Sequence, residues 1–541
     1  MSHLQMYKRQ IVLAAILALA LGLRLWGVGF GLPYVGYNAD EYLVADSALT
    51  MLKTENLNPR EQLPHALHFY LQYVVGKILI TYYDLQNTPL DLVHVSPYTD
   101  LSLGEQLELG VGIPYPFPAL YLWGRVVVAL LGTGTVWIVY HLGRRAFSAH
   151  VGLLAALFLA VSPLHAGESH FLTTGIPGTF FLVLAIYWVF LAYTQRKWWP
   201  YLLALLASAA AIYTKQNGYI ILVTWFSLLA ASIWRGMRDK EYRQILKVSI
   251  VVLGAAFAAL MLSAPHLWGS TVSPDAISAT IAQLYLRIFS NQYVYANSQP
   301  CASGEDIWWW IISQFLSDPW RYIAIISVPG LYFLGRKNRH LLWLWLMPAI
   351  YFFFVGSFTN RFSRWLLPLL PFIAIQAALT MEAAIKWANQ KYNQLLMVRL
   401  SGALIVGLLV IAPFVSVVRT DYILAQKDVR TLAAEWIVKN VPEGAAIVVE
   451  QYGPYVPREK YRVEYLGSVG QYGIEVYQKY GAGYIVASSR WYQCYFRDTD
   501  RYGEVVKGYR NLLNSPVPKT VISGPLLGRS EYSITILDIR R

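Results

Sequence analysis

Two adjacent carboxylates, Asp40 and Glu41, follow closely behind the first strongly apolar segment of the chain. Charged side chains near hydrocarbon cost free energy, so an acidic pair at the exit of a membrane-spanning helix is a candidate for function. A carboxylate within hydrogen-bond reach of a hydroxyl can take its proton during a reaction. The competing interpretation is that the pair stabilises the positive N-terminal end of a helix. The sequence thus indicates acid–base chemistry at a membrane surface.

A set of basic residues is the second group that suits a chemical role. Lys215, Arg361 and Arg364 stand in short loops, and Arg125 stands inside an apolar segment near its end. Arginine binds a phosphate through two parallel donors, and lysine binds it as a point charge. We therefore expect these cations to hold a phosphate. The alternatives are contact with lipid headgroups, extension of the side chains to the interface and, for Arg125, a buried pair with an acidic neighbour.

His165, Glu168 and His170 form a third group. Two imidazoles and a carboxylate so close in sequence could hold a divalent metal ion, which would help to neutralise a phosphate. Because no rigid helix fixes their spacing, we favour hydrogen-bonding roles over metal binding, and we regard the three residues as acceptor or metal candidates. A divalent metal ion is the one cofactor that the sequence brings into consideration.

These residues belong to a strongly apolar chain. Of its 541 residues, 56% are hydrophobic and 14% are charged, and the mean hydropathy is +0.40. This composition is far from that of a soluble globular protein. Apolar runs of about 17 to 25 residues can cross a hydrocarbon core about 30 Å thick. The sequence predicts about eleven such spans, near residues 9–28, 119–142, 151–164, 174–193, 199–213, 218–234, 245–263, 320–335, 340–357, 364–382 and 395–415.

The loops between these spans alternate in charge, which predicts the orientation of the chain. Cytoplasmic loops carry an excess of Lys and Arg, and every second loop is basic, from Lys8 before the first span to Lys391 after the tenth. The N-terminus is therefore expected in the cytoplasm and the C-terminal segment outside. Lys215, Arg361 and Arg364 then lie on the outer face against the bias, which favours an anion there. The net charge of +13 is largely a property of the loops, so no nucleic-acid partner is expected.

The same topology divides the chain into two domains. Residues 1–415 are expected to form the transmembrane domain, with outer segments at 29–118 and 264–319, and residues 416–541 a soluble outer domain. Within the first outer segment, residues 66–83 are apolar but contain His68, Gln72 and Lys77. This mixture favours an amphipathic helix lying in the interface over a further span.

The C-terminal segment changes character from Asp421 onward, where it becomes mixed and polar. The pattern predicts a small α/β domain of about 120 residues, with a helix at 429–440 and strands at 445–450, 484–488 and 533–539. No glycine-rich phosphate loop and no metal-spaced Cys/His set occurs in it, and we expect a lid or an acceptor-docking module. Cys301 and Cys494 both fall on the outer face, where an oxidising compartment would allow a disulfide between them. Two cysteines give no spacing pattern that decides whether it forms.

Several short motifs, taken in order and with the topology, resemble those of the GT-C membrane glycosyltransferases of family 39, which include protein O-mannosyltransferases and aminoarabinose transferases. The resemblance runs from about residue 9 to residue 415, and the segment from Asp428 resembles an extension of some bacterial members. The motifs are Asn38-Ala39-Asp40-Glu41-Tyr42, Gly124-Arg125, Leu142-Gly143-Arg144-Arg145-Ala146-Phe147, Ser162-Pro163-Leu164-His165, Ser169-His170-Phe171-Leu172-Thr173-Thr174, Thr214-Lys215-Gln216-Asn217-Gly218 and Arg364-Trp365-Leu366-Leu367-Pro368.

The resemblance implies a polytopic all-α membrane protein of the GT-C fold that carries the small outer α/β domain. It implies transfer of a sugar, with inversion, from a polyprenyl-phosphate donor to a protein, lipid or glycan acceptor on the outer face. The acidic residue of the family's first outer loop is similar to Asp40, which we expect to be the base. Glu41 is expected to assist it or to contact the acceptor, and the basic residues are expected to bind the donor phosphate.

One position departs from the family pattern. Relatives commonly read Thr-Thr-Asp-x-Pro, whereas this chain has Gly175 after Thr173 and Thr174. The second acidic residue is therefore missing, and Glu168 is the nearby carboxylate that could compensate. This departure supports a rival hypothesis, in which an inactive GT-C-like subunit serves as a structural or lipid-linked-sugar-binding component of a membrane complex. A transporter is disfavoured because no inverted repeat is evident.

Overall fold

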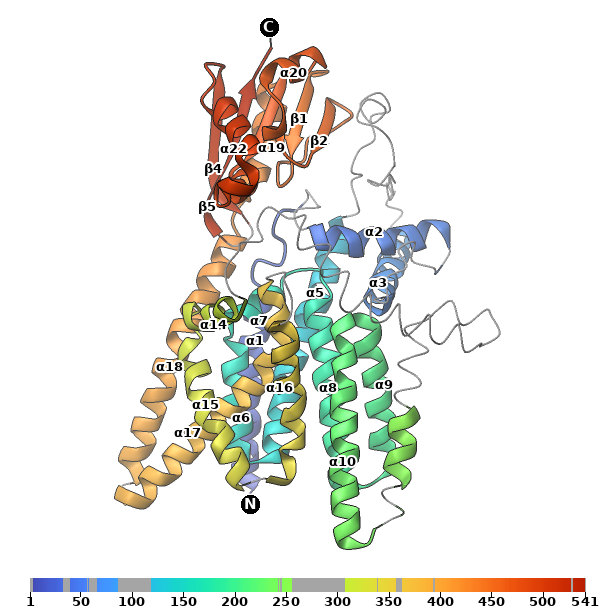
Figure 1. Ribbon diagram of the computed structural model, residues 1–541, viewed down its shortest axis with the longest axis vertical. Coiled ribbons are helices and arrows are strands. Elements are labelled where there is room, and N and C mark those ends of the chain that lie inside the picture. Colours follow the sequence, from blue (N-terminus) through green and yellow to red (C-terminus); the bar gives the residue numbers. More distant parts are fainter. Residues whose placement is uncertain are drawn as a thin grey trace.

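The computed structural model describes residues 3–32, 39–55, 57, 66–85, 118–241, 243, 246–254, 307–337, 339–356, 362–392, 395–526 and 529–540. Long helices stand side by side in a bundle, and a smaller domain containing the C-terminus lies at one end of it, here called the domain end (Figure 1). The bundle helices are α1 (His3–Leu25), α5 (Pro118–Ala146), α6 (Ala149–Ala160), α8 (Gly175–Gln195), α9 (Trp198–Thr214), α10 (Ile221–Asp239), α15 (Arg321–Lys337), α16 (Trp343–Gly356), α17 (Leu370–Tyr392) and α18 (Leu395–Leu424).

Six helical stretches among the described residues are long and apolar enough to cross a membrane: Met6–Leu25, Pro118–Ala146, Gly175–Gln195, Asn217–Met237, Ser363–Tyr392 and Leu396–Asn440. The chain is thus a multi-pass membrane protein, as its composition predicts. The other segments expected to span fall on the shorter helices α6, α9, α15 and α16 and on helical residues 246–254. The total of about eleven spans stays a prediction.

Glycines allow neighbouring helices of the bundle to approach closely. A Cβ atom on Gly152 of α6 would lie 2.5 Å from the carbonyl oxygen of Tyr140 in α5, and one on Gly330 of α15 would lie 2.3 Å from the carbonyl oxygen of Gln376 in α17. Small residues at such contacts are typical of helix packing in membranes. The turn between α5 and α6 is fixed by Ser148, which accepts a hydrogen bond from Val151 N at 3.2 Å as an N-cap. These contacts set the frame that holds the elements of the domain end.

Shorter helices lie at the domain end of the bundle. They are α2 (Ala39–Thr54), α3 (Ala66–Leu85), α7 (Pro163–Glu168), α14 (Ile307–Ser317) and the 3-10 helices η1 (Gln216–Ile220) and η5 (Ser363–Leu369), while η4 (Arg339–Leu341) links α15 to α16. Helix α2 runs crosswise to the long helices (Figure 1), and α3 packs against α2, α5 and α9. The helix expected at 66–83 is confirmed as α3, and its place in the membrane interface stays a prediction.

The C-terminal domain is built on one five-stranded sheet with strand order β2-β1-β3-β5-β4. Strands β1 (Ala446–Glu450), β2 (Arg462–Leu466) and β3 (Tyr484–Ser488) are parallel, whereas β4 (Lys519–Leu526) and β5 (Arg529–Asp538) form an antiparallel hairpin beside β3. Helix α19 (Val429–Asn440) packs on one face. The other face carries α20 (Ile474–Lys479), α21 (Ser489–Phe496) and α22 (Thr499–Leu513), with η6 (Val469–Gln471) between β2 and α20. The α/β domain expected from the sequence is therefore present.

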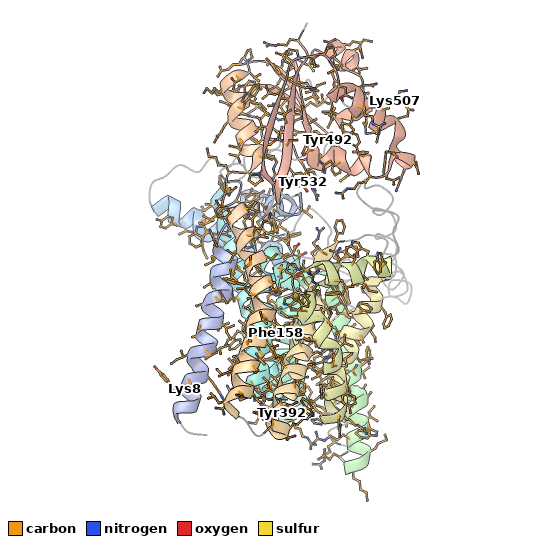
Figure 2. The ribbon with its side chains drawn as sticks, turned by 90° about the vertical axis from the view of Figure 1, so that its left-hand side faces the viewer. Lys8, Phe158, Tyr392, Tyr492, Lys507 and Tyr532 are labelled. Carbon is orange, nitrogen blue, oxygen red and sulfur yellow. The ribbon has the colours of Figure 1, made fainter. Side chains whose placement is uncertain are left out.

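Helix α18 connects the two parts of the molecule. It continues to Leu424, beyond the domain boundary expected after residue 415, and it contacts β4 and β5. Figure 2 shows Lys8 and Tyr392 at the end of the bundle opposite the domain that carries Tyr492 and Tyr532. Cys494 of α21 is buried and takes part in a disulfide. The other cysteine, Cys301, lies outside the described residues.

Candidate active site

Glu41 of α2 and Arg125 of α5 form a buried ion pair at the domain end. The Nε and Nη2 atoms of Arg125 each donate to one carboxylate oxygen of Glu41 at 2.8 Å, and Leu172 N donates to Oε1 of Glu41 at 2.8 Å. Nη1 of Arg125 donates to the carbonyl oxygens of Val28 and Phe30 at 3.1 and 2.8 Å. The pair therefore joins α2, α5, the segment after α1 and the segment before α8.

This geometry bears on the roles expected of Glu41 and Arg125. Arg125 is 1% exposed and has the buried acidic partner that was the alternative to phosphate binding, while Glu41 is 0% exposed and both its oxygens accept hydrogen bonds from the protein. Both side chains are thus occupied by contacts within the protein in this structure, and the roles of Glu41 at the acceptor and of Arg125 at the phosphate stay predictions. Both residues position the start of α2.

Asp40 occupies the first turn of α2, directly before Glu41. The structure describes its backbone, whereas its side chain lies outside what is described. Because Glu41 is fixed through three hydrogen bonds, the backbone of Asp40 has a fixed position at the domain end. That Asp40 is the base stays a prediction. The structure adds the position of its backbone next to the fixed residue Glu41.

His165 and His170 are fully buried where α1, α7 and α18 meet. Nδ1 of His165 accepts from Nη2 of Arg24 at 2.9 Å, and burial together with that guanidinium lowers the pKa of His165, so its ring is neutral. Nε2 of His170 lies 3.0 Å from the carbonyl oxygen of Trp26 and 3.4 Å from Oδ1 of Asp421. The imidazoles thus make hydrogen bonds within the protein, and a contact of these residues with an acceptor stays a prediction.

Metal binding finds no support in the described part of the chain. No group of three His, Cys, Asp or Glu side chains there has a geometry that could hold a metal ion. Glu168 ends α7 and is partly exposed, whereas His165 and His170 are turned into the protein. The three residues are therefore not brought together as a ligand set.

Lys215 lies beside the first turn of α8. It caps α9 with an extended backbone (φ −156°, ψ 141°), and a Cβ atom on Gly178 would lie 3.1 Å from its Cβ. A Cβ atom on Gly175 would lie 3.9 Å from its Nζ atom. The amino group of Lys215 therefore reaches the N-terminus of α8, where backbone N–H groups and the helix dipole favour an anion.

Helix η5 approaches the same turn from the other side. Leu367 Cδ1 lies 3.1 Å from the position of a Cβ atom on Gly175. Residues three apart share a face of a 3-10 helix, so Arg364 lies on the face of η5 that carries Leu367. The guanidinium of Arg364 lies 4.2 Å from the centre of the Phe362 ring. We call Lys215, Arg364 and the first turn of α8 the cationic locus; Arg361, the third expected cation, lies outside the described residues.

A hydrogen-bonded chain fixes the loops of the cationic locus. Asn217 Nδ2 donates to the hydroxyl of Tyr351 at 2.7 Å, and that hydroxyl donates to the carbonyl oxygen of Trp365 at 2.9 Å. Helices η1, α16 and η5 are therefore tied together through residues that closely follow Lys215 and Arg364 in the sequence. The role of Tyr351 is not recognisable from the sequence, because an aromatic residue in an apolar helix carries no mark of such a role.

Two further polar residues near Glu41 were noted only as signs of an interfacial helix. His68 and Gln72 of α3 are 0% exposed, and a Cβ atom on Gly124 would lie 2.6 Å from Oε1 of Gln72. Their spacing of four residues places them on one helix face. That spacing, in an otherwise apolar helix, was the signal that could have identified them as a pair.

Comparison with known proteins gives both a sequence match and a fold match. Residues 122–268 match the family model described as dolichyl-phosphate-mannose-protein mannosyltransferase. An uncharacterised protein of Aquifex aeolicus is 28% identical over 233 residues, which are 40% of this chain and 39% of the relative. The chain thus covers well under half the length of this relative.

Several solved structures share the fold of this chain. The apo oligosaccharyltransferase of Archaeoglobus fulgidus has a TM-score of 0.57 at 12% identity, over 94% of this chain and 73% of the other. ArnT from Cupriavidus metallidurans, bound to undecaprenyl phosphate, has a TM-score of 0.52 at 14% identity, over 97% of both chains. AglB from A. fulgidus, in complex with an inhibitory peptide and a dolichol-phosphate, has a TM-score of 0.54 at 14% identity over 94% and 73%. The predicted GT-C fold, with its C-terminal domain, is thereby confirmed.

Proposed function

We propose that this chain, which has the fold of the GT-C glycosyltransferases, transfers a sugar from a polyprenyl-phosphate donor to an acceptor at the domain end of the bundle. The domain end is, on this proposal, the outer face of the membrane, with the N-terminus in the cytoplasm. The positive-inside pattern of the loops supports that orientation. ArnT and AglB, which share the fold, hold undecaprenyl phosphate and dolichol-phosphate respectively, and this supports a polyprenyl-phosphate as the lipid.

The cationic locus is the observation that carries the proposal. The Nζ atom of Lys215 reaches the first turn of α8, and Leu367 of η5, the helix that carries Arg364, lies against the same turn. Two cations and a helix N-terminus suit a phosphate, because all three favour negative charge. In the reaction they would stabilise the charge that develops on the phosphate as it leaves the sugar.

Asp40 is the residue we assign to proton transfer. Its carboxylate would accept the proton of the acceptor hydroxyl while the hydroxyl oxygen forms a bond to the anomeric carbon. The bond between that carbon and the phosphate oxygen would break at the same time, and its electron pair would leave with the lipid phosphate. A single displacement of this kind inverts the configuration of the anomeric carbon. Glu41 and Arg125 contribute by fixing the backbone of α2 and do not touch the reacting atoms.

Replacement of the base tests this assignment. Asp40→Asn should reduce transfer by about 10²- to 10⁴-fold, the usual contribution of a general base, and should leave binding of polyprenyl phosphate unchanged. Asp46→Asn, the same change further along α2, is the matched control and should keep wild-type turnover. Turnover of Asp40→Asn at the wild-type rate, measured with purified protein in nanodiscs, would show that Asp40 is not the base.

A second candidate function is supported by Gly175, which stands where relatives commonly have an aspartate. A GT-C protein without that carboxylate could bind the lipid-linked sugar as a subunit of a membrane complex and perform no transfer. The same assay separates the two functions: a wild-type protein that binds donor and transfers nothing to any protein, lipid or glycan acceptor supports the binding subunit.

A further inference from the structure

Helix α3 buries two polar side chains that have no hydrogen-bond partner in the part of the chain that the structure describes. His68 and Gln72 are both 0% exposed. Within the described residues, neither ring nitrogen of His68 and neither amide atom of Gln72 takes part in a hydrogen bond. Buried polar groups are almost always hydrogen-bonded, so four unsatisfied atoms on one helix face call for an occupant.

Leaving these groups unsatisfied is costly. A buried donor or acceptor without a partner destabilises the folded protein, whereas leucine or methionine at the same positions would carry no such cost. The neighbouring residue Phe69 is buried and apolar, as expected for a helix that packs against α2 and α5. The polar pair is thus an exception on a packing face, which is typical of residues kept for a ligand.

The pair lies next to the residues that fix the base. Oε1 of Gln72 lies 2.6 Å from the position of a Cβ atom on Gly124, and Leu172 Cδ1 lies 2.8 Å from the same position. Gly124 directly precedes Arg125, and Leu172 donates its backbone N–H to Glu41. Gln72 therefore borders the ion pair that positions Asp40, and a ligand bound to it would lie beside the expected base.

The chemistry of the pair selects neutral hydroxyl groups. Burial lowers the pKa of His68 to about 3, so its ring is neutral and offers one donor and one acceptor. The carboxamide of Gln72 also offers both. A sugar hydroxyl donates and accepts at once, so two adjacent hydroxyls match these two side chains. A phosphate only accepts, and it would leave the acceptor atoms of both residues facing negative charge.

We propose that His68 and Gln72 bind ring hydroxyls of the sugar carried by the lipid donor. This inference rests on the proposed function, in which the donor brings a sugar whatever the acceptor is. The sugar would lie against α3, beside the start of α2, while its phosphate would lie at Lys215 and Arg364. Recognition of the sugar is thereby separated from recognition of the lipid phosphate.

The test compares donors with and without a sugar on the full-length protein in nanodiscs. The probes are undecaprenyl phosphate and undecaprenyl phosphate that carries a hexose, an N-acetylhexosamine or a pentose, with bound lipid measured by native mass spectrometry. The wild type should bind at least one sugar-bearing lipid about tenfold more tightly than bare lipid, corresponding to one or two net hydrogen bonds. Gln72→Met and His68→Leu should each remove most of this difference and leave binding of bare lipid unchanged.

Stability of the ligand-free protein supplies an independent readout. Gln72→Met removes an unpaired buried amide and keeps the shape of the side chain, so its melting temperature should rise, as is common when a functional polar group is removed. Thr81→Val, a change on the exposed side of α3, is the matched control for both measurements and should behave like the wild type.

The possible results separate the two proposals. If the wild type binds neither bare nor sugar-bearing lipid, the proposed function fails and this inference fails with it. If the wild type binds all the lipids equally, the sugar site is overturned, while lipid-phosphate binding stands. Variants that keep the tenfold preference, or a Gln72→Met protein that melts below the wild type, would show that the pair serves packing and does not bind sugar.

Discussion

Glu41 in the bundle and Glu450 in the C-terminal domain are both buried carboxylates, but they are stabilised by different kinds of hydrogen-bond donor. Glu41 in the bundle accepts two hydrogen bonds from the guanidinium of Arg125 and one from a backbone N–H. Glu450, at the end of β1 in the C-terminal domain, accepts from Val469 N at 3.1 Å, from Ser488 N at 2.8 Å and from the hydroxyl of Tyr509. Both are 0% exposed, yet Glu41 has a cation and Glu450 has neutral donors.

The difference determines how each domain responds to pH. Burial raises the pKa of Glu450 to about 7, against the opposing effect of its three hydrogen bonds, so this carboxylate changes charge near neutral pH. Glu41 is instead held by a guanidinium that does not lose its proton in proteins. The fixed pair suits a position next to the expected base, whereas Glu450 makes the C-terminal domain sensitive to pH.

Removal of the cation is expected to have the largest effect. Arg125→Met leaves Glu41 buried with an uncompensated charge, and the loss of one partner of a buried pair costs about 3 to 5 kcal/mol. We expect a strong decrease in melting temperature and in the fraction of monodisperse protein on size-exclusion chromatography. Arg364→Met is the control, because it removes an arginine and leaves the pair of Glu41 and Arg125 intact. This variant should keep the wild-type melting temperature.

A double variant shows whether the unpaired charge is the cause. Glu41→Gln combined with Arg125→Met removes both charges, so it should recover a large part of the stability that Arg125→Met loses. If Arg125→Met alone melts like the wild type, or if the double variant is no better than the single one, the ion pair does not hold the start of α2.

The pH dependence of the C-terminal domain should show the second largest effect. The pKa of Glu450 is raised from 4.5 to about 7 on folding, so the folded state binds more protons than the unfolded state between these values. Stability from this group is fully present below about pH 4.5 and is lost as the pH rises through about 7, by about 3 kcal/mol. Thermal unfolding at pH 5 and pH 8 measures the difference. Glu450→Gln should flatten the profile, and an unchanged slope would assign the pH dependence to other groups.

A carboxylate introduced at the cationic locus would add a third carboxylate, next to a lysine, to the comparison of Glu41 and Glu450. Gly175→Asp places its Cβ 3.9 Å from Nζ of Lys215, within ion-pair reach of the carboxylate. The added negative charge should compete with the lipid phosphate and weaken binding of undecaprenyl phosphate by about tenfold, or about 1.4 kcal/mol. Gly175→Ala, which meets mainly a methyl group of Leu367, is the matched control and should bind nearly as the wild type. Equal affinity for both variants would place the phosphate elsewhere.

The strands that the sequence predicted are those in the interior of the sheet. Strands β1, β3 and β5 are rich in buried Val, Ile and Tyr, so their apolar runs are evident without a structure. The missed strands, β2 and β4, are the two edges of the sheet. In β4 the burial alternates and exposed positions include Lys519, as is usual for an edge strand, whose polar residues resemble those of a loop. Edge strands depend on a neighbour that sequence periodicity does not reveal.

The candidate site shows a similar limit. The residue types alone identify the charged side chains that are candidates for function. They also indicate a buried ion pair as one alternative for Arg125, because an arginine inside an apolar segment needs a partner. The choice between the alternatives depends on Glu41, far away in the chain, and on the backbone of Leu172. Contacts of this kind are set by the packing of α2 against α5, so local spacing does not predict them.

The hydroxyl of Tyr509 provides the smallest and most specific test of the comparison. Tyr509→Phe removes one neutral donor from Glu450 and keeps the buried ring, which packs against Tyr492 and Tyr495. At pH 5, where Glu450 is protonated, the loss should be about 1 kcal/mol, because a hydrogen bond between neutral groups contributes about that much. At pH 8 the carboxylate is charged, and the loss should approach the larger value of hydrogen bonds to charged groups, about 1.5 to 3 kcal/mol. Thermal unfolding of the variant and of Tyr480→Phe, an exposed control, at both pH values measures this. A loss that is the same at pH 5 and pH 8 would mean that Glu450 keeps one charge state throughout this range.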